Sequence, residues 1–388
     1  MRRFTSIVLA MAMTICSGIV GYADDKKAEQ QQSPLNLSSK SAILMDVGSG
    51  QILFEKNSHD KLPPASVTKV MTMLLAVEAL DSGKIKLDDQ VQISERAAEM
   101  GGSQIFLEPG ESQKVDDLLK GIAVASANDA CVAMAEFIGG SEEEFVAMMN
   151  NKAKELGMND THFSNTNGLP VDNHYTSAHD IAIMSKELLK HDKITKYLTT
   201  WMDQIVVGKK QVTIGLANTN KMIKHYQGAT GVKTGFTQEA KYCLSASAKR
   251  GETHLVAATL GAPTTQERFK DASSLLSYGF ANYESVNICA KGDTLATLTL
   301  DKAEENKVKL VAKDDLTALI KKGESKDFTK KIEVSENPKL PIEKGSKLGT
   351  VNIYKGDKQV GKVDLITEKA IKKATYFQMF ERVIDNMF

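Results

Sequence analysis

The sequence predicts an α+β protein in which a domain of mixed helices and strands precedes a small all-β domain. The length of 388 residues fits two or three domains of ordinary size. Helical and strand-like apolar patterns alternate in the first part, whereas only short alternating strands occur beyond residue 284. A composition of 42 % hydrophobic and 25 % charged residues is that of a globular protein, which argues against a disordered chain, a fibre or a polytopic membrane protein.

The charges balance, because 49 Lys and Arg residues face 49 Asp and Glu residues. The chain therefore lacks the positive field of a typical nucleic-acid-binding protein. Cys131, Cys243 and Cys289 are far apart and form no CxxC pair, so we expect each to pack as a small buried side chain. The seven His residues are scattered and none forms an HExxH pair, so no metal ion or cofactor is expected.

Residues 1–23 have the three parts of a secretory signal: two arginines, an apolar run from Ile7 to Val20, and small residues up to Ala23. The alternative is an uncleaved anchor, but the run is short for a span of about 20 residues. Cleavage after Ala23 would leave 47 basic and 49 acidic residues, a net charge of 47 − 49 = −2. The polar, Gln-rich residues 24–37 predict a linker.

The first folded domain is expected over residues 38–283. It begins with AILMDVGSGQILFEKN, which predicts a β-hairpin around its Gly-Ser-Gly turn. Apolar residues at helical spacing then predict a helix from Ser66 to about Leu80. The further expected elements are helices at 115–138 and 142–156 and strands at 229–233, 242–248 and 254–260.

Residues 284–366 are expected to form the all-β domain. Its strands are predicted at 295–300, 307–312, 331–336, 349–354 and 359–366. The last two strands are separated by Lys-Gly-Asp-Lys, a sequence typical of a hairpin turn.

Residues 367–388 return to helical spacing, with large apolar residues on one face and lysines between them. This pattern predicts an amphipathic helix that lies in a membrane interface, which would attach the protein to the outer face of the cytoplasmic membrane. The alternative is that the helix packs against its own domain. No stretch after the signal is long and apolar enough to span a bilayer.

Ser66 and Lys69 form an SxxK motif directly after a Pro-Pro-Ala run, at the predicted start of a helix. Backbone N–H groups are unpaired there, and the positive end of the helix dipole favours an anionic nucleophile. The i, i+3 spacing places both side chains on one face. A desolvated lysine near other cations can lose its proton near neutral pH and act as a general base.

Two further motifs follow, Ser126-Ala127-Asn128 and Lys233-Thr234-Gly235. The first supplies a hydroxyl for proton relay and an amide for peptide groups, and its structural alternative is a capping pair. The second places a cation and a hydroxyl on a strand beside a glycine that would let a substrate backbone approach closely. Each motif alone is weak. Together, with spacings of about 60 and about 105 residues, they are specific.

With these motifs the chain resembles the serine penicillin-recognising enzymes, and more closely the low-molecular-mass D-alanyl-D-alanine carboxypeptidases, or penicillin-binding proteins of the type 5 group. The stretches that resemble the family are AILMDVGSGQILFEKN, LPPASVTKVMT, GIAVASANDACVAMAE, THFSNTNGLP, HYTSAHDIA and GATGVKTGFTQEAKYCLSASAKRGETHLVAATLGA. The resemblance implies a β-lactamase/transpeptidase-like domain with a central antiparallel sheet. It also implies a peptidoglycan stem peptide ending in D-Ala-D-Ala as substrate and β-lactams as inhibitors.

The resemblance assigns a role to each motif residue. Ser66 would be the acylated nucleophile, and Lys69 would be its general base. Ser126 would pass a proton to the leaving D-alanine, and Asn128 would hold the substrate amide.

The remaining expected site residues concern the substrate's carboxylate and oxyanion. Lys233 and Thr234 would attract the terminal carboxylate, and the backbone N–H groups of the nucleophile and of Phe236 would form the oxyanion hole. Arg268 falls where the family has a basic residue near the carboxylate, and its structural alternative is a surface arginine. One departure is Lys241, where the family often has glycine.

Two other functions remain open from the sequence. A β-lactamase shares the three motifs, but class A enzymes have Ser-Asp-Asn at the second motif and a Glu for deacylation. The second motif here is Ser-Ala-Asn, and no comparable Glu segment occurs between residues 140 and 220. A non-catalytic peptidoglycan-binding protein is disfavoured because all three motifs are complete.

Overall fold

The structure is a computed structural model that describes residues 35–335 and 338–385. The predicted signal at 1–23 and most of the predicted linker at 24–37 lie outside the described residues. The described residues from Leu37 onward form one unit.

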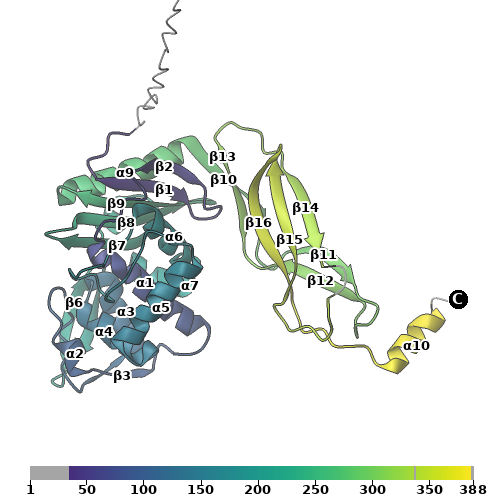
Figure 1. Cartoon of the computed structure of the whole chain (residues 1–388), viewed down its shortest axis with the longest axis horizontal. Coiled ribbons are helices and arrows are strands. Elements are labelled where there is room, and N and C mark those ends of the chain that lie inside the picture. The colour runs from purple at the N-terminus through teal and green to yellow at the C-terminus, as the bar shows by residue number, and fades with distance from the viewer. Residues whose placement is uncertain (1–34, 336–337, 386–388) are drawn as a thin grey trace, which may run out of the picture. The chain divides into compact units, whose positions relative to one another are not determined.

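A five-stranded antiparallel sheet forms the centre of the first domain (Figure 1). Its order is β2-β1-β9-β8-β7. The strands are β1 (Ser41–Asp46), β2 (Ile52–Lys56), β7 (Ala229–Thr237), β8 (Lys241–Arg250) and β9 (Thr253–Ala262). The predicted hairpin and the three predicted later strands are thereby confirmed. Because β7 is an edge strand, one of its sides is free to face the helical part of the domain.

Helices cover both faces of this sheet. Figure 1 shows α9 (Thr265–Asn282) on one side and α1 (Lys69–Asp81) with α6 (Ala178–Leu188) on the other. Eleven of the thirteen residues of α1 are buried, so this helix is the centre of the hydrophobic core. The other elements are β3 (Gln90–Gln92), α2 (Glu95–Ala98), β4 (Ser112–Lys114), α5 (Glu142–Glu155), α7 (Asp192–Thr199), β5 (Met202–Val207), β6 (Val212–Ala217) and α8 (Met222–His225).

The prediction of one continuous helix at 115–138 is wrong, because the structure divides this segment. The segment consists of α3 (Val115–Lys120), a π-helical turn η2 (Gly121–Ala125) and α4 (Asn128–Gly139). Ser126, between the last two, has a left-handed conformation with φ of +64°. Apolar residues on both sides of the break are buried, so the helical pattern in the sequence runs through it without interruption.

The all-β domain is confirmed and has its own hydrophobic core. Its main sheet has the order β11-β12-β16-β15-β14. A second, two-stranded ladder pairs strands β10 and β13, which the sequence analysis did not identify. The strands are β10 (Tyr283–Cys289), β11 (Thr294–Thr299), β12 (Lys307–Ala312), β13 (Leu316–Lys321), β14 (Thr329–Val334), β15 (Lys347–Lys355) and β16 (Lys358–Thr367).

The C-terminal helix is shorter than the sequence predicted. Helix α10 spans Tyr376–Asp385, and the preceding residues are extended rather than helical. The reason is that Ile371 is buried in the core of the β domain and exchanges two backbone hydrogen bonds with Ile342, of 2.8 and 2.9 Å. Within the described ranges, no helix has the length and apolar character that crossing a membrane requires.

Candidate active site

Ser66 lies in a 3-10 turn, η1 (Ala65–Thr68), that leads directly into α1. This confirms the predicted position at a helix start. Ala65 has φ of +49°, a left-handed conformation that costs about 1–2 kcal/mol for a residue other than glycine. A Cβ atom on Gly168 would lie 1.9 Å from the Ala65 carbonyl oxygen, and one on Gly235 would lie 3.0 Å from the Ser66 nitrogen. Both glycines therefore allow other segments to pack directly on the turn that carries Ser66.

Lys69 is fully buried, and its Nζ atom lies 3.0 Å from the Ser66 Oγ atom. Nζ also donates to Asn128 Oδ1 and to the Asn167 carbonyl, both at 2.7 Å. Burial lowers the pKa of Lys69 to about 8. In its neutral form the amine has two N–H donors for the two amide oxygens, so its lone pair is left for the Ser66 hydroxyl. This is the geometry of a general base.

The second motif contacts Lys69 through Asn128. Ser126 is held in its left-handed conformation between η2 and α4, and it is buried. The Asn128 backbone N–H donates to the Ser103 carbonyl at 2.7 Å, and its side-chain amide donates to the Gly101 carbonyl at 2.6 Å. The side-chain oxygen of Asn128, a residue expected to hold a substrate amide, accepts the hydrogen bond from Lys69 in this structure.

The third motif lies on the edge strand β7. Lys233 is only 1 % exposed, and its Nζ donates to the Thr234 carbonyl at 3.1 Å. Burial lowers the pKa of Lys233 well below its usual value, and the neighbouring charges of Lys69 and Arg268 lower it further. Thr234 donates its hydroxyl to Thr219 at 2.6 Å. Thr219 is a member of the site that the sequence analysis missed.

Arg268 is a buried residue of α9 rather than a surface arginine. Its Nη1 atom donates to the carbonyls of Gly235, at 3.1 Å, and Cys243, at 3.3 Å, and so joins α9 to β7 and β8. Phe236, the next residue of β7, is 44 % exposed and its ring lies 4.5 Å from that of Tyr242. Arg268 therefore contacts β7 from α9, whereas the side chain of Phe236 is exposed to solvent.

Lys241 begins β8 with φ of +55°, the conformation that favours glycine. At this position the backbone thus has the conformation that glycine favours, although the residue is a lysine. Its pairing with Thr237 across the β7–β8 turn is intact.

Asn167, in the loop between α5 and α6, is the second site residue that the sequence analysis missed. Its carbonyl accepts from Lys69, and its Oδ1 atom accepts from the Leu169 N–H at 3.0 Å. Its Nδ2 atom is buried and has no hydrogen-bond partner. The run SNTNGLP was noted only as part of the family resemblance, because a backbone carbonyl gives no signal in a sequence.

His174 is linked to the turn that carries Ser66 by a chain of hydrogen bonds. Its Nδ1 atom accepts from the Ser164 backbone N–H at 3.0 Å, which places the ring proton on Nε2. Nε2 then donates to Thr68 Oγ1 at 2.7 Å, and Thr68 donates to the strained Ala65 carbonyl at 2.9 Å. Burial lowers the pKa of His174 to about 4, so the ring is neutral at physiological pH.

We expect His174→Ala to slow acylation by a β-lactam about tenfold without changing which residue is acylated. The substitution leaves the Thr68 hydroxyl and the Ser164 N–H without their partner, which costs about 1–3 kcal/mol of unfolding free energy. His174→Gln, whose amide can donate to Thr68, is expected to restore most of the rate. Stopped-flow acylation measures the effect, with the exposed His225→Ala as control. Equal rates for His174→Ala and the unmodified protein would contradict this positioning role.

The fold and this site define a class. A serine at a helix start, a buried lysine beside it, and a second buried lysine on the edge strand of an antiparallel sheet characterise the penicillin-recognising serine enzymes. Residues 26–264 match the family described as D-alanyl-D-alanine carboxypeptidase, and residues 283–373 match the penicillin-binding protein 5 C-terminal domain. The chain belongs to the D-alanyl-D-alanine carboxypeptidase family.

Individual relatives agree with this assignment. The chain is 44 % identical to D-alanyl-D-alanine carboxypeptidase DacF of Bacillus subtilis, over 99 % of this chain and 98 % of that protein. It is 33 % identical to DacC of Escherichia coli, over 90 % of this chain and 88 % of that protein. Penicillin-binding protein 5 of Haemophilus influenzae superposes with a TM-score of 0.68 at 31 % identity, covering 88 % of this chain and 99 % of that one. The predicted family, enzyme class and fold class are confirmed.

Proposed function

We propose that the protein removes the terminal D-alanine from peptidoglycan stem pentapeptides through an acyl-enzyme on Ser66. The proposal rests on one observation, the 3.0 Å approach of Lys69 Nζ to Ser66 Oγ inside a buried site. Neutral Lys69 takes the hydroxyl proton as Oγ attacks the carbonyl carbon of the penultimate D-alanine. The peptide bond then breaks, and Ser126 relays a proton to the nitrogen of the departing D-alanine. Water hydrolyses the Ser66 ester and releases the shortened peptide.

The negative charges of the substrate, on the oxyanion and on the terminal carboxylate, are proposed to be stabilised by groups on and near β7. The backbone N–H groups of Ser66 and Phe236 are proposed to donate to the oxyanion, each contributing about 3–4 kcal/mol. The close contact of Gly235 with the Ser66 nitrogen supports this, because it brings the two backbones together. The substrate's terminal carboxylate is proposed to lie at Thr234, next to the amine of Lys233 and near the positive charge of Arg268, whose pKa of about 10 keeps it protonated at neutral pH.

A labelled penicillin distinguishes this function from the two alternatives. A carboxypeptidase forms a long-lived adduct, whose mass and peptide map place the label on Ser66, and it releases D-alanine from a pentapeptide. Rapid turnover of the penicillin would indicate a β-lactamase instead. A protein that forms no adduct and releases no D-alanine would be a peptidoglycan-binding protein without catalysis.

We also propose that the chain is exported, with a signal at 1–23 and a linker at 24–37. The catalytic domain then spans 38–283, the β domain 284–366, and the membrane-associating segment 367–388. Family matches that end at residue 264 and resume at 283, together with the start of β10 at Tyr283, support the division between the two domains. A substrate outside the cytoplasm supports export.

The membrane-associating part of that segment is proposed to be α10. Tyr376, Phe377 and Phe380 are 90 %, 70 % and 63 % exposed, an unusual arrangement for large apolar side chains. Arg382, the basic residue in the last turn of α10, donates to the Ala303 carbonyl of the β domain at 2.8 Å. Attachment is therefore expected to depend mainly on the aromatic residues, which suit the membrane interface.

Truncation after Thr375 is expected to abolish co-flotation with anionic phospholipid vesicles. Ending the chain there keeps Ile371 in the β-domain core, whereas ending it at residue 366 would remove that residue as well. Phe377→Ser with Phe380→Ser should give the same loss. The matched control replaces Ile332 and Val334, two exposed apolar residues of β14, by serine. Unchanged flotation of the truncated protein would disprove membrane attachment through α10.

A further inference from the structure

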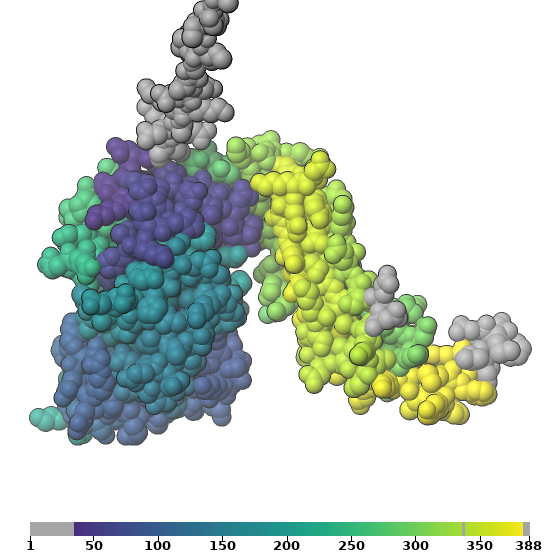
Figure 2. Space-filling view, viewed as in Figure 1, coloured from purple at the N-terminus to yellow at the C-terminus, as the bar shows by residue number. Residues whose placement is uncertain are grey.

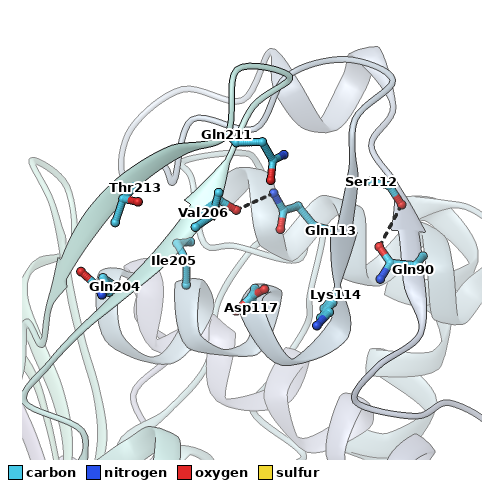
Figure 3. A pocket seen from close by; sticks show the side chains of 10 residues that line it. All are labelled: Gln90, Ser112, Gln113, Lys114, Asp117, Gln204, Ile205, Val206, Gln211 and Thr213. Atoms are coloured by element: carbon cyan, nitrogen blue, oxygen red, sulfur yellow. Dashed lines mark hydrogen bonds between the residues drawn. The ribbon is translucent and has the colours of Figure 1, made fainter.

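A groove of about 480 Å³ lies outside the three-motif site. Figure 3 shows it between the paired strands β3 and β4, the start of α3 and the β5–β6 hairpin. Gln113 Nε2 donates to the Val206 carbonyl at 3.0 Å and so joins the β3–β4 pair to the β5–β6 hairpin. Gln113 and Ile205 are buried, and they give the groove a packed base. The walls are therefore fixed to each other, which favours a preformed site.

The groove is lined mostly by uncharged polar side chains. The amides and hydroxyls that line it, besides Gln113, belong to Gln90, Ser112, Gln204, Gln211 and Thr213. Its charged residues are one of each sign, Lys114 and Asp117, and Asp117 is paired with Lys120 at 3.3 Å. Such a surface has no strong preference for an anion or a cation.

Part of this polar lining is exposed to solvent and therefore open to a ligand. Among the described residues, the Gln204 side-chain amide and the Thr213 hydroxyl make no protein hydrogen bond, although both line the groove. Val206 adds a partly exposed apolar surface next to them. Amides and hydroxyls that both donate and accept, beside a small apolar patch, match the hydroxyl and N-acetyl groups of an uncharged sugar.

The groove is also within reach of the proposed catalytic centre. From Thr213, strand β6 leads in six residues to Thr219, which accepts the hydrogen bond from Thr234. Six residues of extended chain span at most about 22 Å, and an extended pentapeptide spans at most about 18 Å. Along this path the groove and Thr234 are thus at most about 22 Å apart, an upper limit only slightly greater than the length of that peptide.

We infer that this groove is a subsite for the glycan part of peptidoglycan, an N-acetylated disaccharide that bears the stem peptide. The inference rests on the proposed function for the identity of the substrate. It predicts that the enzyme prefers a pentapeptide attached to the disaccharide over the free pentapeptide, because only the former can fill both sites.

The test compares these two substrates with a double variant, Gln204→Ala with Thr213→Ala. The unmodified enzyme is expected to have a kcat/KM about tenfold higher for the disaccharide pentapeptide than for the free pentapeptide. The variant should lose this preference while its kcat/KM for the free pentapeptide stays unchanged. The matched control, Thr329→Ala with Gln359→Ala, removes exposed residues of the same types from strands of the β domain.

Several outcomes would overturn the inference. No preference in the unmodified enzyme would do so, as would a variant that keeps the preference or loses activity equally on both substrates. A separate binding measurement does not depend on catalysis: titration of isotope-labelled protein with the peptide-free disaccharide should shift the amide signals of Gln113 and Val206. Absence of these shifts at millimolar disaccharide would refute the subsite. Absence of D-alanine release from either substrate would instead refute the proposed function.

Discussion

Ser66→Ala is expected to reduce D-alanine release from a pentapeptide by roughly 10⁴-fold or more, because the substitution removes the only atom proposed to form the acyl-enzyme. The fold should be retained. Lys69 keeps its hydrogen bonds to Asn128 and Asn167, and the lost contact is a single hydroxyl. Amino-acid analysis of released D-alanine measures the activity, and mass spectrometry of the penicillin-treated protein should show no adduct.

A suitable control for this variant is Ser277→Ala, which removes a hydroxyl from the exposed surface of α9. Its activity and melting temperature are expected to match those of the unmodified protein. Release of D-alanine by Ser66→Ala at more than about one hundredth of the normal rate would show that another group is the nucleophile.

Lys69→Met is expected to slow acylation by roughly 10³-fold, within the range of general-base contributions. Methionine has a similar length but lacks the amine that lies 3.0 Å from Ser66 Oγ. The change leaves Asn128 Oδ1 and the Asn167 carbonyl without a donor, so a loss of stability is expected as well. Lys154→Met, at an exposed position of α5, is the control for loss of a lysine. Stopped-flow measurement of penicillin acylation provides the rates.

The pH dependence of the unmodified enzyme tests the same role without a substitution. Only neutral Lys69 can accept the proton, and its pKa is lowered to about 8. Below that value the neutral fraction rises about tenfold per pH unit, so the acylation rate should rise with a slope near one from pH 6 to 8 and then level off. A rate that is constant or falls over this range would contradict a neutral Lys69 as the base.

The local parts of the site were predictable from the sequence. A Pro-Pro-Ala run followed by apolar residues at helical spacing indicates where α1 starts, and i, i+3 spacing places Lys69 beside Ser66. The third motif was predicted on a strand and lies on β7. These predictions succeed because each depends on backbone geometry over a few neighbouring residues.

The break at Ser126 shows where such reasoning stops. The apolar residues keep a helical spacing through η2, because residues on both sides of the turn are buried in the core. The spacing therefore gives no sign of the break. What interrupts the helix is a set of backbone hydrogen bonds, including those from Ala127 to Gly121 and from Asn128 to Ser103. The start of α10 was also not predictable from local spacing. Ile371 pairs with Ile342, a residue far away in the sequence, so the helix does not begin before Tyr376.

By itself, the sequence determined the family, the three motifs and the order of the domains, because each is expressed in residue types and short spacings. Only the tertiary structure decided how the motifs support one another. Asn128 and Asn167 hold Lys69 across 59 and 98 positions of the chain, and His174 reaches Thr68 across 106. Such contacts depend on which loops the sheet and α1 bring together. Two of the three contacting groups, the Asn167 backbone carbonyl and the His174 ring, belong to none of the three motifs.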